Sequence, residues 1–270
     1  MTVPKTQSHL NRQALYHREY YLNDCEGFRE FLKSRGARLS RRLAKCLALA
    51  GPEPRELILD LGCGRGELAL HLAKRGARVL AMDPSRDSLG LTRETLATVR
   101  ENALPVGAIG EALPLKTGDI ETVILSDVVE HVTRERLPGL LSECLRVLKP
   151  GGRVIVHTQP NATLLRFTVP LLSRLSFLWG VKLPRDLRLE MTPGAGPEYH
   201  PSEQSRRSLR KALRGAGFTI EELWLEGTYP IHRIFGECRF KQPLIRWFRR
   251  QECLKDLLAS QLFAVARKPG

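Results

Sequence analysis

The stretch Leu59-Asp60-Leu61-Gly62-Cys63-Gly64-Arg65-Gly66 decides the fold class. It follows a short apolar run that begins at Leu57, and it precedes a helical pattern from Glu67 to Lys74. Glycines at alternate positions let the backbone turn sharply and approach a ligand closely. In an open parallel sheet such a ligand lies beyond the carboxyl end of the strand. We therefore predict a ligand-binding loop, the alternative being a tight turn that binds nothing.

Short apolar runs alternate with helical stretches along much of the chain. The predicted strands cover residues 57–61, 78–82, 122–126, 153–157, 219–225 and 261–266. The predicted helices cover residues 67–74, 85–101, 138–148 and 202–215. Strands that alternate with helices of this length indicate a doubly wound α/β domain with a mostly parallel sheet.

The regions outside this alternation predict two additions to the domain. Residues 1–50 contain a cluster of tyrosines and then apolar residues at largely helical spacing, which predicts N-terminal cap helices. Residues 51–270 form the ligand-binding domain. Within it, residues 163–200 combine an apolar stretch with one rich in proline, glycine and charge. This is too long for an ordinary connection, so we predict a lid insertion.

A carboxylate ends the second predicted strand. Asp83 lies where nucleotide-binding α/β domains place an acidic residue for ribose hydroxyls, and a carboxylate accepts two hydrogen bonds from a cis-diol. The alternative is a capping role, because either Asp83 or Ser85 is suited to start the next helix.

Four motifs occur in a fixed order along the chain. They are residues 60–66, Ala81-Met82-Asp83-Pro84-Ser85, Ala112-Leu113-Pro114-Leu115 and Leu148-Lys149-Pro150-Gly151-Gly152. This order resembles that of class I S-adenosylmethionine-dependent methyltransferases over residues 58–156, with a weaker echo at 209–218. The resemblance implies a Rossmann-like fold with a seven-stranded sheet and S-adenosyl-L-methionine as the cofactor. It implies cofactor contacts from Asp60, Gly62, Cys63, Gly64, Gly66, Asp83, Pro84, Ile109, Glu111 and Asp127.

The family's pattern also suggests which part of the cofactor each segment meets. The glycine loop would flank the methionine end, Asp83 the ribose, and residues 109–111 the adenine. The family often has an aspartate near Ile109, and this chain does not. Backbone groups or Glu111 are therefore expected to meet the adenine instead.

The segment Ser126-Asp127-Val128-Val129-Glu130-His131 carries a second group of polar residues. If a helical turn begins here, Asp127, Glu130 and His131 fall on one face, a spacing that suits a hard metal ion or acid–base chemistry. It resembles a motif of metal-using methyltransferases that act on ubiquinone precursors or on small RNAs, which implies Mg²⁺ or Mn²⁺. Those groups have Glu where this chain has Asp127. The alternative is a helix start with acidic residues favoured by the dipole.

Two histidines are candidates for the catalytic base. An acceptor hydroxyl must lose a proton during methyl transfer, and His131 or His200 is able to take it. A protein that binds the cofactor without turnover, a scaffold, is the alternative from another class.

Charge and composition suggest the partner. Lys and Arg outnumber Asp and Glu by 43 to 29, a net charge of +14 that favours an anionic membrane surface or nucleic acid. Segments 164–180 and 239–250 mix cations with large apolar residues. We therefore predict a hydrophobic or lipid-tailed small-molecule acceptor, with RNA 2′-O-methylation as the alternative. Scattered cysteines and a polar N-terminus predict a cytoplasmic protein. The basic charge and the two cation-rich segments favour a peripheral location on the inner face of the membrane.

Overall fold

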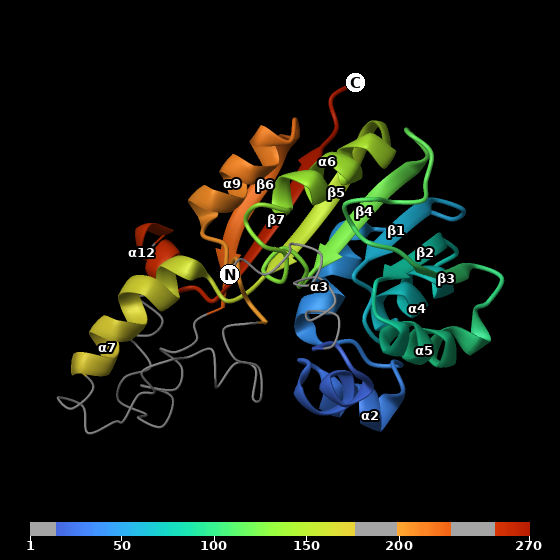
Figure 1. The fold of residues 1–270 in the computed structure, drawn as a ribbon, viewed down its shortest axis with the longest axis horizontal. Helices are drawn as coiled ribbons and strands as arrows, with labels where there is room; N and C mark the ends of the chain where they lie inside the picture. The colour runs from blue at the N-terminus through green and yellow to red at the C-terminus, as the bar shows by residue number, and fades with distance from the viewer. Residues whose placement is uncertain (1–14, 176–198, 228–251) are drawn as a thin grey trace, which may run out of the picture.

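The computed structural model describes residues 15–175, 199–227 and 252–270 (Figure 1). The cation-aromatic segment at 239–250 and the predicted lid between residues 176 and 198 lie outside the described residues. Among the described residues, no helix is long and apolar enough to cross a membrane.

The centre of the molecule is a seven-stranded sheet with the order β3-β2-β1-β4-β5-β7-β6. Its strands are β1 (Leu57–Leu61), β2 (Arg78–Asp83), β3 (Ala103–Gly107), β4 (Ile120–Ser126), β5 (Leu148–Thr158), β6 (Thr219–Glu226) and β7 (Gln261–Arg267). All neighbouring pairs are parallel except those made by β7, which runs antiparallel to β5 and β6. The predicted doubly wound, mostly parallel sheet is confirmed.

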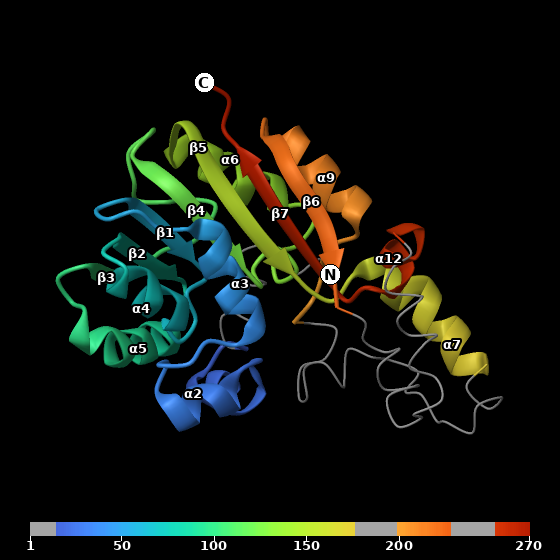
Figure 2. The ribbon, with the colours of Figure 1, turned by 180° about the vertical axis from the view of Figure 1, so that it is seen from behind.

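Helices cover both faces of the sheet. The α-helices are α2 (Phe28–Ser34), α3 (Arg41–Ala50), α4 (Glu67–Lys74), α5 (Arg86–Thr95), α6 (Leu137–Val147), α7 (Val169–Leu175), α9 (Arg206–Gly215) and α12 (Glu252–Leu258). A buried hydrophobic cluster lies between the sheet and the helices on each face. The helices α6 and α9 pack on one face, and α3 and α4 pack on the other. Figure 1 shows α6 and α9 in front of the sheet, and Figure 2 shows α3 from behind.

Short irregular helices flank this domain. The segment before α2 contains a π-helix, η1 (Tyr20–Asp24), and a second, η3 (Leu164–Thr168), leads from β5 into α7. A 3₁₀ turn, η2 (Leu96–Thr98), follows α5. The apolar residues at helical spacing before residue 51 form two separate helices, α2 and α3, because Arg35 and Gly36 adopt left-handed conformations with φ of 48° and 82°.

The strand order places a crevice beside β1. The chain passes outward from β1 to β2 and β3, and then returns to pair β4 on the other side of β1. Connections that leave in opposite directions open a gap at the carboxyl ends of the two strands. The predicted glycine loop follows β1, and the predicted acidic-histidine segment follows β4, so both lie at this gap.

Candidate active site

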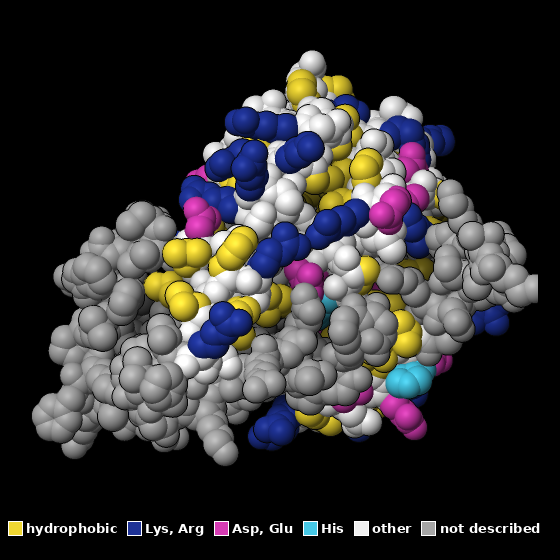
Figure 3. Space-filling view, turned by 60° about the vertical axis from the view of Figure 1, so that its left-hand side comes forward, with side chains coloured by type: hydrophobic (Ala, Val, Ile, Leu, Met, Phe, Trp, Pro, Cys, Tyr) yellow, Lys and Arg dark blue, Asp and Glu magenta, His cyan; other side chains and the backbone are white. Residues whose placement is uncertain are grey.

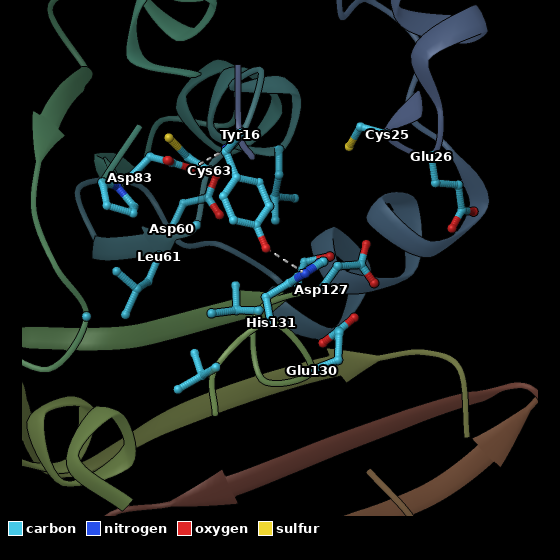
Figure 4. A pocket seen from close by; sticks show the side chains of 18 of the residues that line it. Tyr16, Cys25, Glu26, Asp60, Leu61, Cys63, Asp83, Asp127, Glu130 and His131 are labelled. Carbon is cyan, nitrogen blue, oxygen red and sulfur yellow. Dashed lines mark hydrogen bonds between the residues drawn. The ribbon is translucent and has the colours of Figure 1, made fainter. Parts of the chain in front are cut away.

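A cavity of about 370 Å³ occupies the gap. Its lining comes from the glycine loop after β1, the end of β2, residues 109–111, the turn after β4, residues 159–160, residues of the N-terminal segment and His200. Figure 4 shows Asp60, Cys63 and Asp83 towards one side of the cavity and Cys25 and Glu26 towards the other, with Tyr16 between them. The cavity therefore has a part near the glycine loop and a part near the post-β4 turn.

The glycine loop is shaped by close neighbours. The amides of Gly62 and Cys63 donate to the carbonyl of Met82 at 2.7 and 3.1 Å, which turns the chain at the end of β1. A Cβ on Gly62 would lie 2.5 Å from Cγ2 of Val128 in the post-β4 turn. Gly64, with φ of 56°, has Tyr21 as its nearest neighbour at 3.7 Å and faces the cavity. Gly62 thus permits contact with the post-β4 turn, and Gly64 leaves room for a ligand.

Two buried carboxylates lie beside this loop. Burial, with the nearby charge of Asp83, raises the pKa of Asp60 to about 7. Oδ2 of Asp60 is buried and has no hydrogen-bond partner, although Asp60 lines the cavity. An acceptor without a donor inside a protein is costly, so the position suits a ligand that donates, such as an ammonium group.

Asp83 is held by backbone amides. Its oxygens accept from the amides of Gly64 at 3.1 Å and Ser85 at 2.9 Å. Burial raises the pKa of Asp83 to about 6, although these two amides oppose the shift. The N-cap of α5 is Ser85, whose Oγ accepts from the amide of Ser88. Asp83 is therefore not needed as a cap, and its remaining lone pairs fit a cis-diol such as a ribose.

All but one of the remaining predicted cofactor residues also line the cavity. These are Cys63, Pro84, Ile109, Glu111 and Asp127. Ile109 is 46% exposed, which suits a flat apolar group such as adenine packed against it. The carboxylate of Glu111 is 2.6 Å from Nε of Arg136. Gly66 does not line the cavity, and a Cβ there would meet Thr92, so Gly66 serves packing against α5.

A helical turn does not begin at Asp127, so the condition under which Asp127, Glu130 and His131 would share one helix face is not met. Asp127 has φ of 56°, in the left-handed region, and α6 begins only at Leu137. The Asp127 carboxylate is 2.8 Å from Nε of Arg42 and 2.8 Å from Nδ1 of His157. Burial favours protonation, but Arg42 and then His157 hold the pKa of Asp127 well below its usual range.

The other two residues of the predicted metal site also have protein partners. Glu130 is buried; its Oε2 accepts from Thr158 at 2.8 Å, and burial and the charge of Asp127 raise its pKa. His131 contacts Tyr16 and the carbonyl of Tyr199 instead. Among the residues that the structure describes, no group of three His, Cys, Asp or Glu side chains is arranged to hold a metal ion. The Mg²⁺ or Mn²⁺ site at Asp127, Glu130 and His131 is therefore not supported.

The two candidate histidines meet at the cavity. The ring centroids of His131 and His200 are 4.8 Å apart, and both side chains line the cavity. Nδ1 of His131 is 2.7 Å from the carbonyl oxygen of Tyr199 and 3.0 Å from the hydroxyl of Tyr16 (Figure 4). The structure thus brings together residues from three distant parts of the sequence.

Sequence reasoning missed the N-terminal contribution. Tyr16, Tyr20, Glu26, Arg42 and Arg65 line the cavity as well. The tyrosine cluster is noticeable in the sequence, but the residues that it contacts, such as Ser85 and His131, lie far away in the chain. The two arginines carried no signal that distinguished them from the many others.

Comparisons with known proteins agree with this geometry. A family model described as "Methyltransferase domain" matches residues 28–223. A ubiquinone biosynthesis O-methyltransferase of Dechloromonas aromatica is 32% identical over 118 residues, 42% of this chain and 47% of that enzyme. The chain thus spans about half the length of this curated relative.

Solved structures share the fold. A complex between the Haloferax volcanii Trm112 methyltransferase activator and a methyltransferase matches with a TM-score of 0.61 and 18% identity, covering 93% of this chain and 98% of that one. A geranyl diphosphate methyltransferase solved with S-adenosylmethionine matches with a TM-score of 0.58 and 15% identity, covering 92% and 94%.

The sheet order, the glycine loop and the two carboxylates define a Rossmann-like methyltransferase fold. The chain belongs to the methyltransferase-domain family, in the class I group that uses S-adenosylmethionine. The orphaned oxygen of Asp60 and the amide-held carboxylate of Asp83 fit the ammonium group and the ribose of that cofactor.

Proposed function

We propose that this protein transfers a methyl group from S-adenosylmethionine to a hydroxyl oxygen of a hydrophobic, lipid-tailed small molecule. The observation that carries the proposal is a single cavity in which the cofactor carboxylates and the His131–His200 pair face the same space. The ubiquinone biosynthesis O-methyltransferase similarity supports oxygen as the acceptor atom.

His131 is the proposed base. A carbonyl oxygen only accepts, so Nδ1 of His131 carries the hydrogen in its contact with Tyr199. In the neutral ring the lone pair then lies on Nε2, which is suited to take the proton of an acceptor hydroxyl. The cofactor supplies a methyl group already activated on a sulfonium sulfur. The protein's part is to align that group with the acceptor oxygen and to remove the proton.

The charge of the cavity argues against a polyanionic acceptor. Seven acidic side chains line it, those of Glu26, Asp60, Glu67, Asp83, Glu111, Asp127 and Glu130, and six remain when Glu130, whose pKa burial raises, is counted as neutral. Three arginines oppose them, Arg42, Arg65 and Arg136. An RNA acceptor would bring phosphates to this acidic lining, which is unfavourable, whereas the sulfonium cation of the cofactor is favoured there. We therefore prefer a small molecule to RNA.

A surface formed by η3, α7 and α12 supports a lipid-tailed acceptor. Phe167, Leu171 and Leu257 are exposed by 61, 56 and 39%. Their elements adjoin, since Thr168 donates to the carbonyl of Leu257 at 2.7 Å. Arg206 on α9 is 3.8 Å from Asp256 of α12, so α9 lies next to this group.

The outer face of α9 is basic. Arg207, Lys211 and Arg214 are exposed, while Leu209 and Leu213 are buried on the opposite side. Figure 3 brings the α7, α9 and α12 side forward and shows Lys and Arg side chains gathered above a group of hydrophobic ones. Cations beside exposed apolar side chains suit the surface of an anionic bilayer. We propose that this surface holds the enzyme at the membrane where its acceptor lies.

Transfer of labelled methyl groups tests the proposal. The purified protein is incubated with methyl-labelled S-adenosylmethionine and a bacterial cell extract, which is then separated into lipid, RNA, protein and small-molecule fractions. We expect label in the organic-soluble fraction, stable to RNase and protease. Label in RNA would favour the alternative of RNA 2′-O-methylation, and the absence of label from all fractions would favour a cofactor-binding scaffold.

The His131→Gln variant tests the base. Loss of general base catalysis typically costs about 10²–10⁴ in rate, so labelling should fall by that order while cofactor binding is kept. His71→Gln is the matched control, because Nε2 of His71 also contacts a backbone carbonyl, that of Gly36 at 2.9 Å, away from the cavity. Full activity of the His131→Gln enzyme would rule out this base.

A further inference from the structure

Arg65, inside the glycine loop, binds the N-terminal segment. Its guanidinium donates to the carbonyls of Tyr21 at 2.7 Å, Glu26 at 2.8 Å and Cys25 at 3.3 Å. The same group pairs with Glu67 at 2.8 Å, and the Arg65 side chain is 2% exposed. A guanidinium presents five donors in a fixed fork, and here the fork joins the cofactor loop to one short stretch of backbone.

A second buried arginine binds the same stretch from the other side. Nη2 of Arg42, on α3, donates to the carbonyl of Glu26 at 3.2 Å. Nε of Arg42 is 3.3 Å from the carboxylate of Glu26 and 2.8 Å from that of Asp127. Arg65 therefore ties the segment to the cofactor loop, and Arg42 ties it to the post-β4 turn.

The segment that these arginines hold forms one wall of the cavity. Tyr16, Tyr20, Tyr21, Cys25 and Glu26 all line it. At its start, the carbonyl of Tyr16 accepts from Oγ of Ser85 at 2.8 Å, two residues beyond the cofactor carboxylate Asp83. The hydroxyl of Tyr16 meets His131 at the far side. The wall thus contacts groups on both sides of the cavity.

We propose that Arg65 and Arg42 are positioning residues that fasten residues 15–27 across the cavity, so that the acceptor side of the site is completed only when the cofactor loop is in its bound arrangement. Cofactor binding and the order of this wall are then coupled, and the coupling passes through Arg65. This inference rests on the cofactor site but not on the acceptor proposed above, so the labelling experiment and the one below fail separately.

Amide hydrogen exchange with S-adenosylhomocysteine as the probe tests the coupling. In the wild type, saturating S-adenosylhomocysteine should slow exchange in peptides that cover residues 15–27. Arg65→Lys keeps a positive charge for Glu67, but a single ammonium is unable to reach the three carbonyls together. In this variant the probe, again at saturation, should no longer slow exchange in the segment. Its affinity should fall by about fivefold or more, as for other coupled sites.

The control is Arg146→Lys. Arg146 also pairs with a carboxylate, Glu143, and donates to the carbonyls of Leu115 and Leu113, but outside residues 15–27. It should leave the probe's affinity and the protection of the segment unchanged. If Arg65→Lys unfolds, the double variant Arg65→Gln/Glu67→Gln, which removes both buried charges, takes its place. A folded Arg65 variant in which the probe protects residues 15–27 as in the wild type would overturn the proposal.

Discussion

Asp83 should make cofactor affinity depend on pH. Only the ionised carboxylate offers all its lone pairs to ribose hydroxyls, and burial raises the pKa of Asp83 to about 6. As the pH falls through that value the carboxyl takes up a proton, so affinity is present above it and lost below it. We expect S-adenosylhomocysteine to bind about tenfold more weakly at pH 5 than at pH 8.

The matched variant is Asp83→Asn, which keeps the shape but does not titrate. Calorimetric titration of both proteins at the two pH values makes the comparison. The variant should bind weakly and lose the part of the pH dependence that Asp83 causes, while Asp60, whose pKa burial raises to about 7, still titrates in this range. Equal wild-type affinities at pH 5 and pH 8 would contradict the assigned role of Asp83.

Gly62 lies against Val128 of the post-β4 turn, and a double variant should measure how strongly the two positions are coupled. Alanine at this left-handed position costs about 1–2 kcal/mol in backbone strain, and its Cβ would collide with Val128 at 2.5 Å, for about 1–3 kcal/mol more. The free energy of unfolding of Gly62→Ala should fall accordingly. Adding Val128→Ala should recover the collision part only, a coupling that denaturant unfolding of the four proteins measures. Strictly additive effects would mean that the turn moves aside freely.

At the scale of elements, the spacing of apolar residues predicted the strands and helices whose bounds depend on nearby residues in the sequence. The strand at 57–61 and the helix at 67–74 have the predicted bounds, because a buried run and an amphipathic run meet at the glycine loop. The strand β3 escaped prediction. It is a short edge strand that contains Pro105 and leaves Leu104 58% exposed, so neither burial nor alternation marks it in the sequence.

Cavity residues were predictable from the sequence only where they belong to a recognisable motif. Asp60, Gly64 and Asp83 line the cavity, as expected from their places at the ends of β1 and β2 and in the glycine loop. Arg42 and Arg65 were not expected there, since their roles depend on carbonyls about 16 to 44 residues away. The helical turn considered at residues 127–131 does not begin at Asp127, because contacts with Arg42 and His157 accompany a left-handed Asp127, a tertiary effect that outweighs local preference.

The post-β4 turn should work without a divalent ion. Oδ2 of Asp127 pairs with Arg42, Oδ1 lies 2.8 Å from Nδ1 of His157, and Glu130 accepts a hydrogen bond from Thr158 and has a raised pKa. A divalent ion would have to break these contacts to gain its ligands. Methyl transfer measured in excess EDTA should therefore proceed at the rate found without it. A loss of activity that Mg²⁺ or Mn²⁺ restores would contradict this geometry.

Across the whole molecule, the acidic excess lies in the cavity lining and the basic excess lies outside it. The chain carries +14, yet acidic side chains outnumber arginines in the cavity lining by six to three even when Glu130, whose pKa burial raises, is counted as neutral. The basic excess therefore lies outside the cavity. An acidic cavity attracts a sulfonium cation, and a basic exterior attracts an anionic surface. One chain can thus bind a cationic cofactor and lie on a negatively charged membrane without conflict.

Binding to anionic vesicles should follow from the exterior charge and the exposed apolar side chains together. A basic residue near such a surface contributes about 1 kcal/mol, which salt screens, whereas apolar insertion is not screened. The full-length protein should float with phosphatidylglycerol vesicles at low salt and in substantial part at moderate salt. Phe167→Ser/Leu171→Ser should float at low salt only, because the apolar contribution is lost.

Charge-reversal variants locate the surface. Arg207→Glu/Lys211→Glu/Arg214→Glu changes the exposed face of α9 and should abolish flotation at low salt. Lys74→Glu/Arg75→Glu/Arg93→Glu makes the same change of net charge on exposed residues at the end of α4 and in α5, which lie at the other end of the sheet (Figure 1). If the α9 surface docks, this control should float like the wild type. Equal losses in both variants would mean that net charge alone attracts the protein, and tight, salt-sensitive RNA binding without flotation would favour the RNA reading.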